Sequence, residues 1–166
     1  AQGSVFFATR SDGLEVAIKV AGRSRTSRRS LKSEIAMLQA ARDVRGVVRC
    51  LDVIDVEGHP ALVMPRYPGH LGPWLRQVID EPDEQSLTLI LNRTAELARI
   101  LGRVHRLTHE GGTLVHRDVK PENVFVDEDG FLQLGDFGAA LTIDGLRELE
   151  LALYGTPLWA PLDQIL

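Results

Sequence analysis

Five side chains that can carry protons, phosphates or metal ions lie within eight positions of one segment, LVHRDVKPENVFV, at residues 114–126. They are His116, Arg117, Asp118, Lys120 and Asn123. The Asp118 carboxylate only accepts hydrogen bonds, which suits a substrate hydroxyl, and the Asn123 amide oxygen suits a hard ion such as Mg²⁺. A solvated surface loop is the simpler alternative, so the rest of the sequence must decide between the two.

Two other segments carry the groups that such a loop would need. Asp136 lies in GDFG, thirteen residues after Asn123, and the hairpin expected between them returns the chain to the same end of its sheet. The strand VAIK ends with Lys19, and an inward lysine needs a counter-ion, for which Glu34 is the natural candidate. Phosphoryl transfer needs metal ions, a cation on the phosphates and a carboxylate that orients the attacking hydroxyl. These residue types therefore favour phosphoryl transfer.

The composition indicates a folded protein without a nucleic-acid footprint. The 166 residues are 44% apolar and 25% charged, and the formal net charge is −4. Cys50 is the one cysteine, so no intrachain disulfide can form, and a buried free thiol is expected. No apolar run reaches membrane-spanning length. We therefore expect a cytoplasmic protein without membrane segments or nucleic-acid partners.

The first part of the chain shows the alternation of strands around one helix. Strands are expected at residues 5–9, 14–20, 51–56 and 61–64, with RSDG and EGHP as turns. Between them, Leu31, Ile35 and Leu38 share one helical face, and Ser30 is a plausible N-cap. The basic run at residues 23–32 is either a solvated loop or a dock for phosphate or an acidic partner, and Ser27 and Ser30 within it are candidate modification sites.

Beyond a proline-rich break, the pattern becomes helical. A helix over residues 86–105 is apolar around nearly its whole circumference, so it should be buried on several sides. Two short strands are expected around VFV and FLQL, joined by the acidic turn at residues 127–130. This turn has neither the glycine position nor the closing glutamate of a calcium loop.

The strand lysine, the helix glutamate, HRDVKPEN and DFG resemble, in this order, the signature set of the protein kinase family. The match extends from Gly3 to the end of the sequence, and HRDVKPEN followed by DFG at this distance is highly specific. The resemblance implies an α+β, two-lobed protein-kinase-like fold with a small β-rich N-lobe and a partial helical C-lobe. The implied boundaries are residues 1–64 for the N-lobe, 65–69 for the hinge and 70–166 for the C-lobe through the activation segment.

The resemblance also implies the roles of the reactive residues. Asp118 would be the catalytic base, and Lys120 would steady the transferring phosphoryl group. Lys19 would hold the α- and β-phosphates of ATP and be held by Glu34. Mg²⁺ would be bound by Asn123 and Asp136. Lysine two positions after the catalytic aspartate is more similar to serine/threonine kinases than to tyrosine kinases, which implies a protein substrate with a serine or threonine acceptor.

The adenine pocket follows from the same resemblance. Met64 takes the gatekeeper position, Pro65 contributes only its carbonyl, and Tyr67 offers its backbone N–H. The nucleotide would lie between a roof and a floor of apolar side chains, contributed by Val5, Ala17 and Phe125. Without the motifs, ordinary core packing would be the better interpretation of these apolar residues.

The sequence departs from the family pattern in three places. Only Gly3 and Val5 match the end of the glycine-rich loop, and the usual Ala-Pro-Glu reads APL at residues 160–162. These two departures predict a domain that is partial at both ends, with further residues or another chain covering the helix at 86–105. The usual phosphorylated position is Ala152, so we expect Glu148 or Glu150 to supply the negative charge that pairs with Arg117; both glutamates on a solvated turn is the alternative.

Taken together, these observations predict a serine/threonine protein kinase that transfers the γ-phosphate of ATP to a protein hydroxyl. A catalytically silent regulatory or scaffolding module of the same fold is the first alternative. A small-molecule kinase of similar architecture is the second, although Lys120 and the YGTP segment are more similar to protein-substrate kinases.

Overall fold

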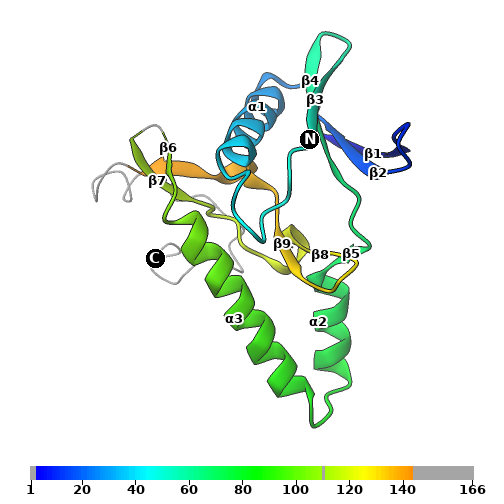
Figure 1. The fold of residues 1–166 in the computed structure, drawn as a ribbon, viewed down its shortest axis with the longest axis vertical. Helices are drawn as coiled ribbons and strands as arrows, with labels where there is room; N and C mark the ends of the chain where they lie inside the picture. The colour runs from blue at the N-terminus through cyan, green and yellow to red at the C-terminus, as the bar shows by residue number, and fades with distance from the viewer. Residues whose placement is uncertain (1–2, 110, 144–166) are drawn as a thin grey trace.

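The computed structural model describes residues 3–109 and 111–143 (Figure 1). The expectations for Glu148, Glu150 and the APL segment concern positions outside these ranges. Within them, the architecture is α+β, as predicted, with one larger sheet, two small sheets and three helices. The lobe boundaries at residues 64 and 69 stay predictions.

The larger sheet has four antiparallel strands in the order β1-β2-β4-β3. They comprise β1 (Ser4–Thr9), β2 (Glu15–Val20), β3 (Asp52–Val56) and β4 (His59–Pro65). The central strands β2 and β4 carry the buried residues Val16, Ala61 and Leu62, whereas all of β1 is exposed. Lys19 pairs with Leu62 in this sheet, which fixes the position of its side chain on β2.

Helix α1 (Arg25–Ala40) packs against the sheet through a face that contains Leu31, Glu34 and Leu38. The predicted N-cap at Ser30 is wrong. Ser24 caps the helix, because its extended backbone lets its hydroxyl accept a hydrogen bond from the Ser27 N–H at 3.1 Å. The basic run therefore forms the first turns of α1, and Ser30 lies inside the helix.

Two helices follow the larger sheet, α2 (Leu71–Asp80) and α3 (Ser86–Val104). Figure 1 shows them extending away from the sheet and meeting at the turn between them. Ile100 and Val104 near the end of α3 are buried, but Leu87 and Leu91 near its start are 67% and 58% exposed. The expectation that this helix is buried on several sides is therefore wrong for the part of the chain that the structure describes, and its coverage by other residues or another chain stays a prediction.

The remaining strands form two small antiparallel sheets. One has the order β10-β7-β6 and the other the order β5-β8-β9. Their members are β5 (Gly69–His70), β6 (Thr108–His109), β7 (Gly112–Val115), β8 (Val124–Val126), β9 (Leu132–Leu134) and β10 (Leu141–Ile143). Two 3₁₀ turns, η1 (Pro121–Asn123) and η2 (Phe137–Ala139), follow β7 and β9 and carry the charged segments.

One continuous apolar core joins these parts. It includes Leu38 of α1, Val48 of the connection after α1, Leu134 of β9 and Phe137 of η2. The backbone strengthens this junction, since the Val48 N–H donates to the Leu134 carbonyl at 2.9 Å. The charged segments are therefore fixed against α1 by buried apolar contacts. Among the described helices, none has the length and apolarity needed to cross a membrane.

Candidate active site

Lys19 joins three elements of the fold. Its Nζ atom donates to Glu34 Oε1 and Oε2 at 2.9 and 2.7 Å and to Asp136 Oδ1 at 2.9 Å. The Glu34 side chain is 3% exposed and that of Lys19 is 22% exposed, so most of this contact is shielded from water. The strand, the helix and the turn after β9 therefore meet at one ammonium group, as the sequence predicted for Lys19 and Glu34.

The protonation of this group follows from burial and charge. Burial alone would lower the pKa of Lys19, but the carboxylates of Glu34 and Asp136 outweigh it and raise that pKa above its ordinary value. Burial also raises the pKa of Glu34, and the adjacent Lys19 offsets this only in part. Lys19 therefore stays cationic at neutral pH, held by two carboxylates.

The loop after β7 orders the Asp118 carboxylate. Asp118 Oδ2 accepts from Lys120 Nζ at 2.7 Å and from Asn123 Nδ2 at 3.0 Å, and the same Nδ2 donates to the Asp118 backbone carbonyl at 2.8 Å. Pro121 opens the short turn η1, where a missing N–H costs nothing. The predicted catalytic aspartate, lysine and asparagine are thus one hydrogen-bonded unit.

His116 connects this loop to the turn after β9. It is 1% exposed; its Nε2 lies 2.8 Å from the Gly135 carbonyl, and its Nδ1 lies 3.3 Å from the Asp118 backbone N. A neutral ring with the proton on Nε2 satisfies both contacts, and burial lowers the pKa of His116 accordingly. The ring also meets Phe137 edge-on, with centroids 4.6 Å apart.

Two residues of the site have left-handed backbones that only glycine adopts without strain. Arg117 has φ +64° and Asp136 has φ +57°. Such conformations persist where the surroundings hold them, and they gather at functional sites. Here the turn after Asp136 is held on both sides, since Ser30 Oγ donates to the Gly138 carbonyl at 3.1 Å and Arg117 Nε donates to the Ala139 carbonyl at 2.8 Å.

A cavity of about 630 Å³ opens in front of these groups. Eight predicted site residues line it, and they are Val5, Lys19, Glu34, Met64, Asp118, Asn123, Phe125 and Asp136. Four others are not among its lining residues: Lys120, which donates to the lining residue Asp118, and Ala17, Pro65 and Tyr67. Ala17 is buried in β2 opposite Met64, and Pro65 ends β4 opposite Val16.

Tyr67 supports the floor of the cavity rather than lining it. Its ring stacks on Phe125 with centroids 5.4 Å apart. Burial raises the pKa of the Tyr67 hydroxyl to about 12, although the Arg49 backbone N–H lowers it. The hydroxyl is therefore neutral, and the ring acts as an apolar backing for Phe125.

The oxygen donors of the cavity fit Mg²⁺ bound together with phosphates. Within the described ranges, no group of three or more histidine, cysteine or acidic residues could hold a metal ion. Asp136 and Asn123 nevertheless line the same cavity. Asn123 uses Nδ2 for its side-chain hydrogen bonds to Asp118, and among the described residues its Oδ1 has no hydrogen-bond partner, so this oxygen can serve a ligand. Because Mg²⁺ is commonly bound by one or two protein oxygens, phosphates and water, this small donor set suits it.

Sequence reasoning missed the two residues that grip the turn after Asp136. The sequence predicts Ser30 as an N-cap, and it predicts that Arg117 pairs with Glu148 or Glu150. The sequence gives no reason to expect a left-handed backbone at Arg117, because bulky residues rarely adopt that conformation. For Ser30, its position four residues before Glu34 on one helical face was a usable signal.

Comparison with known proteins identifies the family. The description "Protein kinase domain" applies to the family whose pattern matches residues 1–162, so the chain belongs to the protein kinase domain family. It is 32% identical over 126 residues to the serine/threonine-protein kinase US3 homolog of Gallid herpesvirus 2 (strain GA), covering 76% of this chain and 29% of that protein. It is 29% identical over 183 residues to the serine/threonine-protein kinase pim-2 of Danio rerio, covering 99% of this chain and 56% of that protein.

A third relative extends the range of organisms. The chain is 30% identical over 164 residues to the receptor-like kinase TMK2 of Arabidopsis thaliana, with 93% of this chain and 18% of that protein covered. The chain thus spans less than two thirds of the length of each of these relatives. The comparisons establish the domain family and the α+β fold, and what the whole protein does is a matter for proposal.

Proposed function

We propose that this chain is part of a serine/threonine protein kinase that transfers the γ-phosphate of ATP to a protein hydroxyl. The single observation that carries the proposal is the convergence of Lys19, Glu34 and Asp136 at one ammonium group beside a cavity that Asp118 and Asn123 also line. A cation, a hydroxyl-orienting carboxylate and metal-binding oxygens are the parts that phosphoryl transfer requires. The serine/threonine kinases among the relatives support the same class of acceptor.

Lys19 is the phosphate-binding cation in this proposal. Its raised pKa keeps the ammonium charged. A phosphate oxygen would replace one of the two Glu34 oxygens as the acceptor of a Lys19 N–H, while the other keeps Lys19 in place. Glu34 positions Lys19 rather than contacting substrate. The contact with Asp136 brings the cation next to the carboxylate assigned to the metal, so phosphates and metal are held in one place.

Asp118 is the proposed catalytic base. Lys120 and Asn123 both donate to Oδ2, which fixes the plane of the carboxylate and orients it toward an incoming hydroxyl. As the acceptor hydroxyl attacks phosphorus, its proton passes to the Asp118 carboxylate. Lys120, already at 2.7 Å from that carboxylate, supplies positive charge near the transferring group.

The proposed cofactor is Mg²⁺, held by Asp136 and Asn123. When bound, the ion would neutralise phosphate charge and align the phosphates for in-line attack. The apolar residues Val5, Met64 and Phe125 line the same cavity and would enclose the adenine base. Ala17 pairs with Met64 in the sheet, Pro65 follows Met64, and Tyr67 stacks on Phe125. We also propose a cytoplasmic location, where the single cysteine of this chain would stay reduced.

The test is a comparison of Asp118→Asn with Asp129→Asn in the full-length protein. Asp129 lies in the β8–β9 turn, away from this cavity, so it controls for loss of a surface carboxylate. Transfer of labelled γ-phosphate to serine and threonine peptides should fall by about 10³-fold in Asp118→Asn and stay unchanged in Asp129→Asn. Binding of Mg·ATP by calorimetry should survive both changes.

Each other outcome selects an alternative. Mg·ATP binding without transfer above the Asp118→Asn level would make the protein a catalytically silent module. Transfer to small metabolites but not to peptides would make it a small-molecule kinase. Failure to bind Mg·ATP would reject the proposal entirely.

A further inference from the structure

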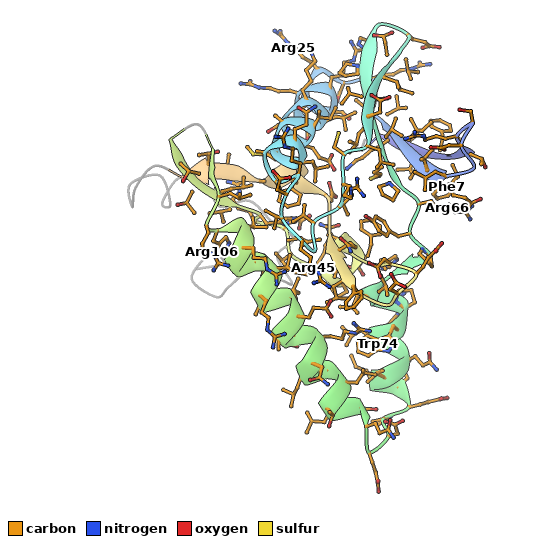
Figure 2. The ribbon with its side chains drawn as sticks, viewed as in Figure 1. Phe7, Arg25, Arg45, Arg66, Trp74 and Arg106 are labelled. Carbon is orange, nitrogen blue, oxygen red and sulfur yellow. The ribbon has the colours of Figure 1, made fainter. Side chains whose placement is uncertain are left out.

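A second cavity, of about 720 Å³, lies between α3, the connection after α1 and the β8–β9 turn. It shares no lining residue with the 630 Å³ cavity among the described parts of the chain. Gly46, with φ +91°, lets the connection approach α3 so closely that a Cβ atom there would meet the Ile100 side chain at 2.5 Å. Figure 2 shows Arg45 from this connection beside α3. The proposed kinase chemistry gives this cavity no role.

Four arginines line this cavity in a protein whose net charge is negative. They are Arg45, Arg93, Arg99 and Arg103, and we call the space the arginine cavity. Arg99 and Arg103 are one helical turn apart, so their side chains extend along the same face of α3. Three acids, Glu96, Asp127 and Asp129, share the lining.

Two of the three acids accept hydrogen bonds within the fold, one on each carboxylate oxygen. Glu96 accepts from the Leu132 N–H at 2.8 Å and from Arg93 Nη1 at 2.9 Å. Asp127 accepts from the Phe131 N–H and from Gln133 Nε2, both at 2.8 Å. These bonds hold the β8–β9 turn in shape, and the Arg93 cation offsets the charge of Glu96. Three arginines, Arg45, Arg99 and Arg103, then face the two carboxylates of Asp127 and Asp129, so the lining keeps a net positive charge.

The arginines, in contrast, keep most of their donors. Arg99 is exposed and makes no hydrogen bond with any residue that the structure describes, and Arg45 only covers the Phe131 ring, 5.4 Å from its centroid. Arg103 uses one Nη1–H on the Arg45 carbonyl. Because each guanidinium carries five N–H donors, most of the arginine donors in this cavity can still bind an anionic ligand.

The cavity is longer than a single anion and has an apolar part. Arg93 and Arg103 are ten residues apart on α3, which corresponds to about 15 Å along the helix axis. An extended peptide of about five residues spans that length. Phe131 is 49% exposed at the cavity and offers an apolar surface. Repulsion from Asp129 acts on any anionic ligand, so it is the apolar surface of Phe131, which an apolar residue of a peptide can match, that favours a peptide over a nucleic acid.

We propose that the arginine cavity is a docking site for an acidic peptide segment of a partner protein, with an apolar residue between its carboxylates. The carboxylates accept from Arg45, Arg99 and Arg103 in forked contacts, and the apolar side chain packs against Phe131. Peptide binding at this cavity needs no nucleotide and no phosphoryl transfer, so the docking proposal can be tested independently of the proposed kinase activity.

The test uses fluorescence anisotropy of a labelled Glu-Glu-Leu-Glu-Glu peptide with the protein in the absence of ATP. We expect saturable binding that weakens at high salt and is absent for a Gln-Gln-Leu-Gln-Gln peptide. Arg99→Ala and Arg45→Ala should each weaken binding by about three- to tenfold. Asp129→Asn should tighten it by about twofold, because it removes one negative charge from the lining.

Arg106→Ala is the matched control, since Arg106 is exposed just beyond α3 and does not line the cavity. If Arg106→Ala weakens binding as much as Arg99→Ala, the peptide is attracted only by diffuse surface charge, and the proposal is wrong. Displacement of the peptide by an equal concentration of inorganic phosphate would reduce the cavity to a single-anion site and also overturn it. So would a single-stranded oligonucleotide that binds more tightly through the same arginines.

Discussion

Lys19 Nζ and Asp136 Oδ1 lie 2.9 Å apart, although 117 positions separate the two residues in the sequence. Glu34 of α1 accepts from the same ammonium at 2.7 Å. One cation therefore fixes the relative positions of β2, α1 and the turn after β9. Any change to this cation should alter stability as well as catalysis.

Lys19→Met should lower the free energy of unfolding by about 2 kcal/mol, because it leaves the buried Glu34 carboxylate without its cation. Adding Glu34→Gln should recover part of this loss, since the unpaired charge is then gone. Urea denaturation of the two variants measures both effects. The deficit of Lys19→Met should shrink at low pH, where Glu34, whose pKa burial raises, takes up a proton.

A double variant that is less stable than Lys19→Met alone would contradict this account. It would mean that Glu34 stabilises the fold through contacts other than the one with Lys19. Glu34→Ala is unsuitable for the comparison, because it would add a cavity to the effect of charge.

The stability of the fold should depend on the charge of His116. Its pKa is lowered by burial from 6.5, so below pH 6.5 the unfolded chain binds a proton that the folded chain does not. The free energy of unfolding should therefore fall with decreasing pH from 6.5 to the folded pKa, by up to about 1.4 kcal/mol per pH unit. His116→Asn should be less stable at neutral pH and show a shallower slope.

The exposed His105 provides the control for this measurement. His105→Asn should leave the slope between neutral and mildly acidic pH unchanged, as measured by urea denaturation at a series of pH values. An equal slope in the wild type and in His116→Asn would show that His116 does not link folding to pH.

The charged and polar residues of the candidate site were predictable, because the residue types and their spacing are visible within short segments of the sequence. Lys19 ends an alternating strand, and Asp118, Asn123 and Asp136 stand at fixed distances around short strands. The four strands of the larger sheet were predictable because the turn signals RSDG and EGHP separate short runs rich in strand-forming residues. The burial of α3 was not predictable. Its apolar residues indicate that the helix favours burial, but they do not identify the surface against which it packs.

Capping was the local feature that the sequence left ambiguous. Ser24, Ser27 and Ser30 are all acceptable caps at the start of α1, and only the extended backbone of Ser24 selects one of them. The hydrogen bond of Ser30 to Gly138 depends on tertiary packing of α1 against η2, 108 positions away. A contact between residues so far apart in the sequence leaves no hydrophobic periodicity from which it could be predicted.

Gly135→Ala should destabilise the protein by about 1–3 kcal/mol through overpacking. A Cβ atom at this position would lie 2.8 Å from both Phe125 Cε2 and Val48 Cγ2, in the floor of the cavity. Gly69→Ala is the matched control, because a Cβ atom there has open space around it. Thermal unfolding of both variants measures the difference, and equal melting temperatures would show that the floor can shift without cost.

Ser30→Ala should lower phosphotransfer activity by about three- to tenfold with little loss of stability, since it removes one partly buried hydrogen bond between α1 and the turn after Asp136. Freed from Ser30, the Gly138 carbonyl no longer ties this turn to α1, and Asp136 is held beside Lys19 less firmly. The effect should therefore appear as a raised KM for Mg·ATP, partly relieved by excess Mg²⁺, while peptide KM is unchanged. Ser33→Ala on the same helix is the control, because Ser33 makes no hydrogen bond through its side chain with the described residues. A Ser30→Thr variant keeps the hydroxyl and should retain most activity; if it is as impaired as Ser30→Ala, the hydrogen bond is not what positions Asp136.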